Sequence, residues 1–390
     1  MRTAPTPIQL RPVRSGWATL AIWTGTGLAC AAFAILILER IRESFAGGQM
    51  PLNDFFAFWC FAKYALAHGA QGIYGPARLH AFMQSMDDSL RQHYPYPYPP
   101  FFLLMIFPLG LLTQAQAYIA WMSATLGLYL LASLERNRPW RSLLFALAPA
   151  AMINLYLGQT GFLSSALIVA GFRLLQPRPV LAGILLGLVS FKPQLGILLP
   201  VALIAARQWR AIAAAAGTIA TLVLTSGIAF GWSCWKEWLA LLPSHSRYVE
   251  QAVNNHYKPT ITATLEIAGL APGAAHVVQA IAALVIVGIV WVCFRRGSRL
   301  APAALEAGTF LAAPYAFFYD LPMLTNATIA ASSERERPAG AVQTAILALS
   351  ILFPIVMLLT WRLWPIPLPS IVLLFVLIVQ RIRGSKQIGV

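Results

Sequence analysis

The sequence predicts an all-α polytopic membrane protein, and its composition and its long apolar runs both support this. Apolar residues make up 58% of the 390 residues and charged residues only 11%, whereas a soluble domain carries about 25% charged residues. The mean hydropathy is +0.68. These figures exclude a disordered chain, a coiled coil and a disulfide scaffold. We expect one integral membrane domain over residues 1–390, with no separate soluble domain and no internal repeat.

The chain is strongly basic, with 28 Lys and Arg against 13 Asp and Glu, a net charge of +15. In a membrane protein such an excess is typical of cytoplasmic loops, so we predict no nucleic-acid partner. The four cysteines are scattered and have no metal-ligand spacing. No metal site and no cofactor are expected.

The first predicted crossing is Trp17–Leu38, because about 20 apolar residues are needed to cross about 30 Å of hydrocarbon. Arg2, Arg11 and Arg14 precede it, which places the N-terminus in the cytoplasm. The segment lacks a small-residue cleavage site, so it is interpreted as an anchor and not as a removed signal peptide.

A long polar segment, 39–98, follows and is expected on the external side as the first external loop. Within it, 55–66 is aromatic and 78–91 is amphipathic, so both are predicted to be helices lying on the membrane surface. The run 94–100 alternates Tyr and Pro, which favours a rigid extended segment. A second external loop is predicted at 231–271.

Twelve further apolar segments could cross the membrane. They are 101–114, 115–134, 142–157, 160–175, 180–191, 195–206, 211–231, 272–294, 302–318, 321–331, 339–360 and 369–380.

With the first crossing these make thirteen candidates, but Arg381, Arg383 and Lys386 indicate a cytoplasmic C-terminus and therefore an even number. We predict about 12 crossings, with 101–114 as a re-entrant or partial helix broken by Pro108. One continuous crossing over 180–206 is the alternative. The first choice assigns 18 of the 28 basic residues to the cytoplasmic side, in agreement with the positive-inside rule.

The acidic and imidazole side chains gather on the predicted external side, which holds all four aspartates, all six histidines and five glutamates. Any acid–base chemistry is therefore expected at that face. Asp54 begins the aromatic helix, where it could be an N-cap or a general base. The two roles are compatible, because a helix start fixes the position of the carboxylate.

Lys192 interrupts two short apolar runs, and a lysine there is costly unless it reaches water or an anion. It could extend from a helix end to the surface or contact a phosphate.

Two external turns carry the other polar candidates. Gln159 stands in a Gly-Gln-Thr-Gly turn whose glycines follow from turn chemistry alone. Its amide suits a sugar hydroxyl or a phosphate. Tyr319 and Asp320 lie in the second turn, where Asp320 could also be a helix cap. In the preferred topology Asp54, Gln159, Lys192 and Asp320 converge on one face. No P-loop, Rossmann, HExxH or GxSxG motif is present.

Several different short motifs follow one another along the chain in a characteristic order. They are Asn53-Asp54, Gly72-Ile73-Tyr74, Tyr98-Pro99-Pro100, Gly158-Gln159, Gly183 to Gly187, Phe191-Lys192-Pro193-Gln194, Arg207 to Arg210 and Pro314 to Leu321. In this order they resemble glycosyltransferase family 87, whose members are polyprenyl-phosphate-sugar-dependent transferases of the GT-C membrane superfamily. The resemblance covers about residues 15–385.

The resemblance implies a GT-C fold in the bacterial cytoplasmic (inner) membrane with its active site facing the periplasm. The donor would be a polyprenyl-phosphate sugar, with mannose the first candidate, and the acceptor a glycolipid or glycan. Transfer would be inverting and metal-independent, with Asp54 as the base and Gln159, Tyr319 and Asp320 lining the pocket. Lys192 is the first candidate to meet the donor phosphate.

His256 and Lys258 are further candidates for the phosphate contact. Relatives often carry a histidine near the last motif, where this chain has Pro314-Tyr315. Membrane lipid is the expected surrounding partner.

Three other interpretations remain at this stage. A transporter or flippase of lipid-linked sugars would explain the broken helix at Lys192-Pro193, although its ionisable residues should lie near the membrane midplane. A lipid-linked glycan ligase or polymerase would rely on more external arginines. A structural scaffold would leave the polar motifs unexplained.

Overall fold

The computed structural model of the chain describes residues 16–46, 54–135, 141–333, 340–359 and 367–384. Within these ranges the chain forms helices and no strand, as the composition predicts. Four of the described helices are long and apolar enough to cross a membrane: α1 (Gly16–Ala46), α5 (Gln114–Ser133), α11 (Trp209–Phe230) and α14 (Pro272–Arg295).

The remaining helices are shorter or less apolar. The α-helices are α2 (Asp54–His68), α3 (Pro76–Met86), α4 (Phe102–Ile106), α6 (Arg141–Leu147), α7 (Pro149–Leu157), α8 (Gly161–Leu174), α9 (Pro179–Leu188), α10 (Leu199–Ala205), α12 (Trp232–Val249), α13 (Ile261–Ile267), α15 (Ala301–Ala312), α16 (Pro322–Ser332), α17 (Ala341–Leu359) and α18 (Pro367–Gly384). The 3-10 helices are η1 (Phe107–Leu111), η2 (Val189–Phe191), η3 (Ala252–Tyr257) and η4 (Phe318–Asp320). The expected count of about 12 crossings is not confirmed by these lengths.

Two breaks bear on the predicted crossings. Segment 101–114 forms α4 followed by η1, which together reach only about half the thickness of the hydrocarbon core. It is therefore a partial helix, as predicted. The alternative of one continuous helix over 180–206 is wrong, because α9 and η2 end at Phe191 and α10 begins at Leu199.

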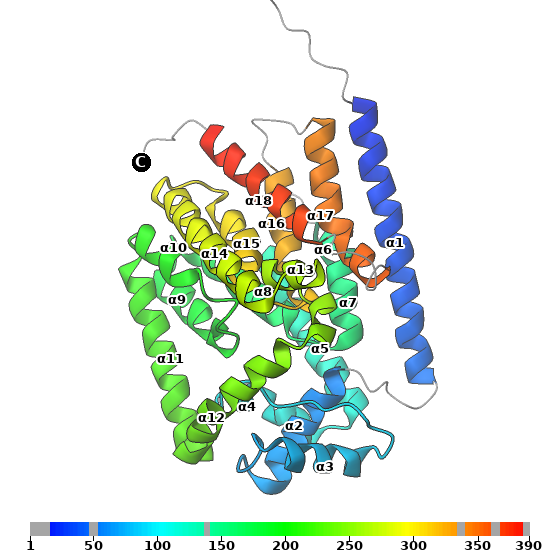
Figure 1. Cartoon of the computed structure of the whole chain (residues 1–390), viewed down its shortest axis with the longest axis vertical. Helices are drawn as coiled ribbons and strands as arrows, with labels where there is room; N and C mark the ends of the chain where they lie inside the picture. The colour runs from blue at the N-terminus through cyan, green and yellow to red at the C-terminus, as the bar shows by residue number, and fades with distance from the viewer. Residues whose placement is uncertain (1–15, 47–53, 136–140, 334–339, 360–366, 385–390) are drawn as a thin grey trace, which may run out of the picture.

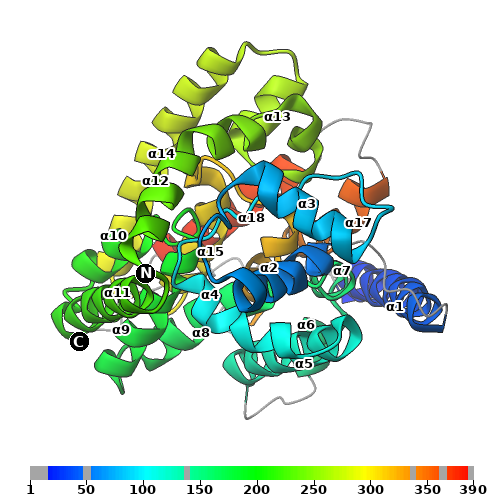
Figure 2. The same ribbon diagram turned by 90° about the horizontal axis from the view of Figure 1, so that it is seen from below.

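The helix ends divide the molecule into two faces. The first residue of α1 and the last of α18 lie at the top in Figure 1, whereas α2, α3, α4 and α12 lie at the bottom. Seen from below, α2, α3 and α12 extend across the ends of other helices (Figure 2). The first and last described helices thus have their outer ends on one side, as the sequence predicts.

Each of the two segments predicted as surface-lying helices contains a helix, but the second helix ends at Met86 and not at residue 91, and α2 packs differently from a surface-lying helix. Nine of its residues, from Phe55 to Ala65, are buried in the protein. Because its aromatic residues point in all directions around the helix axis, they leave no wide polar face for water. By contrast, α3 buries only Leu79 and Met83, one turn apart, as an amphipathic helix does.

The second external loop folds into α12, η3 and α13, and it packs onto the first. The backbone N–H of Gly72 donates to the Glu237 carboxylate at 3.3 Å, and the Trp238 indole donates to the Pro97 carbonyl at 3.1 Å. The two loops therefore form one layer at the lower end of the molecule, which we call the external layer (residues 54–101 and 231–271) after the side on which the sequence predicts it.

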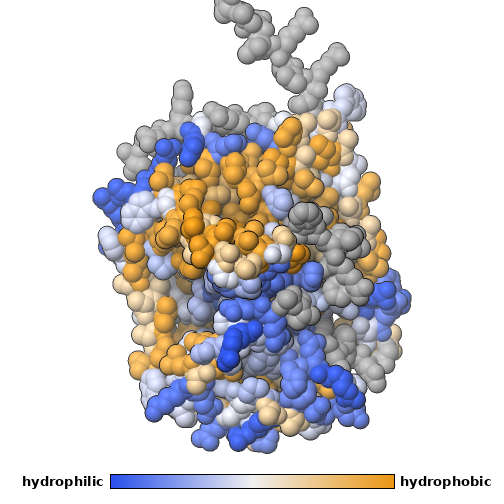
Figure 3. Space-filling view, viewed as in Figure 1, coloured by the Kyte–Doolittle hydropathy of each residue, from blue (hydrophilic) through white to orange (hydrophobic). Residues whose placement is uncertain are grey.

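The core lies among α7, α8, α15 and α16. Every residue of α15 except the half-buried Pro302 is buried, and so are residues 161–169 of α8. The outer helices expose large apolar side chains, such as Leu28 on α1, Ile228 on α11 and Leu284 on α14. Figure 3 shows this hydrophobic surface over the upper part of one face, with a more hydrophilic region below it. Such a belt is typical of a protein surrounded by lipid.

Candidate active site

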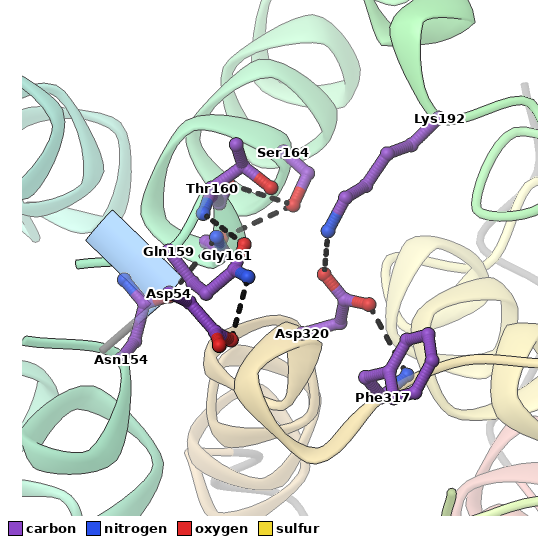
Figure 4. A network of polar contacts seen from close by, with 9 residues as sticks. All are labelled: Asp54, Asn154, Gln159, Thr160, Gly161, Ser164, Lys192, Phe317 and Asp320. Carbon is purple, nitrogen blue, oxygen red and sulfur yellow. Dashed lines mark hydrogen bonds and ion pairs between the residues drawn. The ribbon is translucent and has the colours of Figure 1, made fainter. Parts of the chain in front are cut away.

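A cavity of about 500 Å³ lies between the external layer and the adjacent helix ends. Four of the residues predicted for the site line it, namely Asp54, Gln159, Lys192 and Tyr319. They come from four places in the chain: the start of α2, the α7–α8 turn, the turn after η2, and η4. Figure 4 shows how Asp54, Gln159 and Lys192 are arranged around this space.

Asp54, the first residue of α2, is held by the α7–α8 turn. The Gln159 side-chain amide donates to Asp54 Oδ2 at 2.8 Å (Figure 4). The Gln159 oxygen accepts in turn from the Thr160 backbone N–H at 3.3 Å. The glutamine amide, which the sequence left without a protein partner, therefore orients the carboxylate. The position of Asp54 at the N-terminus of α2 also favours the negative charge of its carboxylate.

Two glycines give the α7–α8 turn its shape. Gly158 has a φ of 69°, a left-handed conformation that ends α7, and a Cβ there would collide with Phe55. A Cβ at Gly161 would collide with the Tyr319 carbonyl. The second glycine therefore lets α8 begin directly against η4, which brings Asp320 close to the turn that holds Asp54.

The environment of Asp54 shifts its acidity in a direction that suits a base. Burial raises the pKa of this carboxyl above its usual value, and this effect is opposed by the Gln159 hydrogen bond and by the positive charge of Lys192. A carboxylate with a raised pKa accepts a proton more readily.

Lys192 is buried and paired. Its Nζ lies 2.7 Å from Asp320 Oδ1, and the two side chains are 4% and 0% exposed. The ammonium also lies 4.7 Å from the centre of the Tyr319 ring, a cation–π contact. Asp320 Oδ2 accepts from the Phe317 backbone N–H at 3.3 Å. Asp320 thus stabilises its own turn and also fixes a cation at the cavity wall, whereas the N-cap of α16 is Leu321, without a side-chain cap bond.

Aromatic side chains form most of the remaining wall. Tyr94 and Tyr98 come from the Tyr-Pro run, Tyr315 from the turn before η4, and Trp238 and Tyr248 from α12. Burial, together with the Asp54 charge, raises the pKa of Tyr94 and of Tyr248. Both phenols therefore stay protonated at neutral pH. Tyr94 donates its proton to the Gln92 side-chain oxygen and Tyr248 donates its proton to the His93 carbonyl, so a hydroxylated ligand would compete with these acceptors.

The contribution of α12 is absent from the sequence prediction, which left 231–271 as a loop. Besides Tyr248, its cavity residues are Trp238, Leu242, His245 and Val249. They recur at intervals of three and four positions, the spacing of one helix face. That periodicity could have predicted a helix, but the Gly, Pro and polar residues of this segment favoured the prediction of a loop.

Two predicted phosphate contacts are not brought to the cavity. Lys258 Nζ donates to the Val249 carbonyl at 2.7 Å, and neither Lys258 nor His256 is among the described residues that line the space. The amine of Lys258 supports the end of α12 instead. Among the described residues, no three His, Cys, Asp or Glu side chains are grouped so that they could hold a metal ion.

The fold and the cavity define a polytopic membrane protein with an enzyme-like site, in which a carboxylate and a buried cation face one aromatic space. The family model for glycosyltransferase family 87 matches residues 96–317, more than half of the chain. The chain therefore belongs to this family and is a membrane glycosyltransferase. No curated protein and no solved structure matched it.

Family membership decides between the interpretations that the sequence left open, because it supports a sugar transferase over a transporter or a scaffold. The matched range includes Gln159 and Lys192, whereas Asp54 and Asp320 lie outside it. The structure connects these two carboxylates to the matched range through the Gln159 and Lys192 contacts.

Proposed function

We propose that the protein transfers a sugar, with mannose the first candidate, from a polyprenyl-phosphate donor to a hydroxyl of a lipid or glycan acceptor. The site would face the periplasmic side of a bacterial cytoplasmic membrane. The observation that carries the proposal is that the Asp54 carboxylate and the Lys192 ammonium line the same cavity beneath the external layer. A single displacement needs such a pair, a base for the acceptor and a cation for the leaving phosphate.

The proposed reaction inverts the anomeric carbon. Asp54 accepts the proton of the acceptor hydroxyl as that oxygen attacks C1 of the sugar. The C1–O bond to the phosphate breaks, and its electron pair stays on the phosphate oxygen. Gln159 holds Asp54 Oδ2, so we assign the proton to Oδ1. Lys192, kept in place by Asp320, stabilises the negative charge that develops on the departing lipid phosphate.

The aromatic wall suits the sugar and the lipid parts of the donor. Flat rings of Tyr98, Phe191 and Phe317 line the cavity and offer apolar faces to the C–H surface of a hexose. The tyrosine hydroxyls offer hydrogen bonds to its hydroxyl groups. A lipid-linked donor also brings its activated sugar within the membrane, which agrees with the absence of nucleotide-binding motifs.

The test is a transfer assay with purified protein in liposomes. Radiolabelled polyprenyl-phosphate-mannose and a native lipid extract are supplied to the wild type, to Asp54→Asn and to the control Asp87→Asn, whose carboxylate is an exposed partner of Ser89. We expect a labelled product from the wild type and the control, a loss of about 10²–10⁴-fold for Asp54→Asn, and no effect of EDTA.

Each other outcome removes a specific part of the proposal. Equal product from Asp54→Asn and the wild type would exclude Asp54 as the base. Loss of product with EDTA would contradict the metal-independent reaction. Transfer from another lipid-linked sugar, but not from the mannose donor, would correct the sugar and keep the base.

A further inference from the structure

A second cavity, of about 340 Å³, lies at the opposite end of the molecule from the catalytic cavity. It is formed by one stripe of α14 and by the last turns of α18. In Figure 1 these helix ends meet at the upper left, beside the described end of α18 and far from α2 and α3. The proposed transfer reaction uses no residue of this cavity.

The outer rim of this cavity is positively charged. Arg296 follows the last turn of α14 and Arg383 lies in the last turn of α18; both line the cavity and both are exposed. Within the described part of the chain, neither guanidinium is joined to a carboxylate by an ion pair. Two such guanidiniums on one rim form a site for an anion, since each can donate two parallel hydrogen bonds to a phosphate.

The inner wall of the same cavity is apolar. Val285 and Val292 of α14 and Ile382 of α18 line it. At Gly288, between the two valines, a Cβ would meet no heavy atom within 4 Å, so the groove is open at this point. A site with cations at its rim and an apolar wall below has the polarity of a phospholipid, whose phosphate stands at the interface and whose chains point inward.

The order of the cavity residues along α14 matches the orientation of a phospholipid in a membrane. Val285, Gly288, Val292 and Arg296 fall on one face of α14 over about three turns. The charge lies at the helix end, where a crossing helix reaches the membrane surface. Figure 3 shows hydrophilic residues at the upper left edge beside hydrophobic surface. Basic pockets between helices at a membrane face are a recognised mode of binding acidic lipid head groups.

We propose that this cavity binds an anionic phospholipid, with its phosphate between Arg296 and Arg383 and an acyl chain along the open groove at Gly288. The lipid would fasten the end of α18 to α14 and so stabilise the folded protein. Both helices pack on α15 but contact each other directly at few points, so a shared ligand would add a direct link between them. This proposal does not depend on the identity of the transferred sugar.

The test measures lipid binding by the full-length protein purified in a neutral detergent. Phosphatidylglycerol, phosphatidylcholine or inorganic phosphate is titrated, bound lipid is counted by native mass spectrometry, and thermal unfolding is followed in parallel. We expect phosphatidylglycerol to bind and to raise the unfolding temperature, and phosphatidylcholine to do neither. Arg296→Gln with Arg383→Gln should weaken phosphatidylglycerol binding about tenfold or more.

Arg295→Gln with Arg299→Gln is the matched control, because both arginines are exposed at the same end and neither lines the cavity. Gly288→Phe tests the apolar half with both charges intact, since its ring would occupy the groove. Its control is Gly217→Phe, at another exposed helix position with open space. We expect Gly288→Phe to reduce lipid binding and Gly217→Phe to leave it unchanged.

Three results would overturn the proposal. An equal loss of phosphatidylglycerol binding in the two double-arginine variants would mean that the lipid is attracted to the basic surface in general and not to this cavity. Stabilisation by inorganic phosphate equal to that by phosphatidylglycerol would assign the site to a free anion. Unchanged binding in Gly288→Phe would exclude the groove as the place of the acyl chain. That variant keeps the charges, so it decides the question even if the arginine pair does not fold.

Discussion

At the residue scale, the site depends on two polar pairs that place opposite charges at one cavity. Asp54 is oriented by Gln159 and Lys192 by Asp320, at 2.8 Å and 2.7 Å. In each pair, one residue carries the charge that lines the cavity, and its partner fixes the position of that charge. The arrangement fixes both charges in a partly dehydrated site, where an electrostatic contribution to catalysis is larger than in water.

The acid limb of the pH profile should report on Asp54. Activity needs the deprotonated carboxylate, so it should rise with pH through a pKa that lies above that of an ordinary aspartate. Gln159→Leu removes a donor that favours the charged form. We therefore expect the acid limb of kcat/KM to move to higher pH in this variant.

Gln84→Leu is the control, because Gln84 bonds to the Leu90 carbonyl outside the cavity. An unchanged limb with a lower plateau in Gln159→Leu would show that Gln159 positions the base without tuning its pKa. A limb displaced to lower pH would contradict the assignment of Asp54 as the titrating base.

Replacing one member of the Lys192–Asp320 pair should lower the stability of the folded protein more than replacing both members. Lys192→Met leaves a fully buried carboxylate without its cation, which we expect to destabilise the protein by roughly 3–5 kcal/mol. The double variant Lys192→Met, Asp320→Leu should recover much of that stability but little of the transfer activity. Thermal unfolding and the transfer assay on the same preparations measure both effects.

Full activity in the double variant would show that the pair is structural and that the donor phosphate is met by another group. Additive losses of stability in the two single variants, with no recovery in the double, would show that the two groups do not interact.

At the element scale, short helices with tight ends bring the site residues together. The left-handed Gly158 ends α7, and Gly161 lets α8 begin against η4. The η2 turn ends α9 and places Lys192 at the cavity. The α12 helix then closes one side through the Trp238 hydrogen bond to Pro97. Interrupted helices thus serve the site by presenting their ends to one space.

Gly161→Ala should disturb the site from the backbone. Its Cβ would meet the Tyr319 carbonyl, so α8 and η4 must separate or the substitution costs stability, by about 1–3 kcal/mol for a core overpacking. Because Tyr319 and Asp320 belong to η4, a displacement of η4 should also lower the transfer activity. Thermal unfolding and the transfer assay check the two effects.

Gly127→Ala is the matched control, since a Cβ at that position on α5 meets open space and alanine favours the helix. We expect it to be neutral or slightly stabilising. If Gly161→Ala behaved like Gly127→Ala, the close approach of α8 to η4 would not matter for the site.

At the scale of the whole molecule, two faces are separated by an apolar belt. The catalytic cavity lies beneath the external layer, and the described ends of α1 and α18 lie at the other face (Figure 1). Arg295, Arg296 and Arg299 also lie near that face, at and after the C-terminal end of α14. From the positive-inside rule we therefore expect the cavity to face the outside of the cell.

Cysteine labelling should test that orientation. Ser89→Cys introduces an exposed thiol in the predicted first external loop and Ser298→Cys introduces a half-exposed thiol at the opposite end, while native Cys60, Cys234 and Cys293 are buried. In intact cells we expect a membrane-impermeant maleimide to label Ser89→Cys only. After the membrane is permeabilised, both variants should react.

The wild type measures background labelling, including that of the partly exposed Cys30. Labelling of Ser298→Cys alone in intact cells would reverse the orientation and would move the proposed transfer to the cytoplasmic face.

The class of fold, the family and the polar residues that need a partner in apolar surroundings could all be predicted from the sequence. These properties are local, because the cost of dehydrating a charge and the apolar composition can be read at each position. The number of crossings could not be settled in the same way. A buried core helix such as α15 is as apolar as a helix in lipid, so hydropathy does not separate the two.

Which polar groups act together depends on the tertiary packing and could not be predicted from the sequence. Asp54 meets Gln159 across 105 residues, Lys192 meets Asp320 across 128, and α12 supplies a wall that the sequence had left as a loop. The tertiary packing also turned Lys258 toward the Val249 carbonyl, away from the cavity. These outcomes depend on how helix ends pack against one another, since a hydrogen bond forms only where two distant segments are brought within about 3 Å.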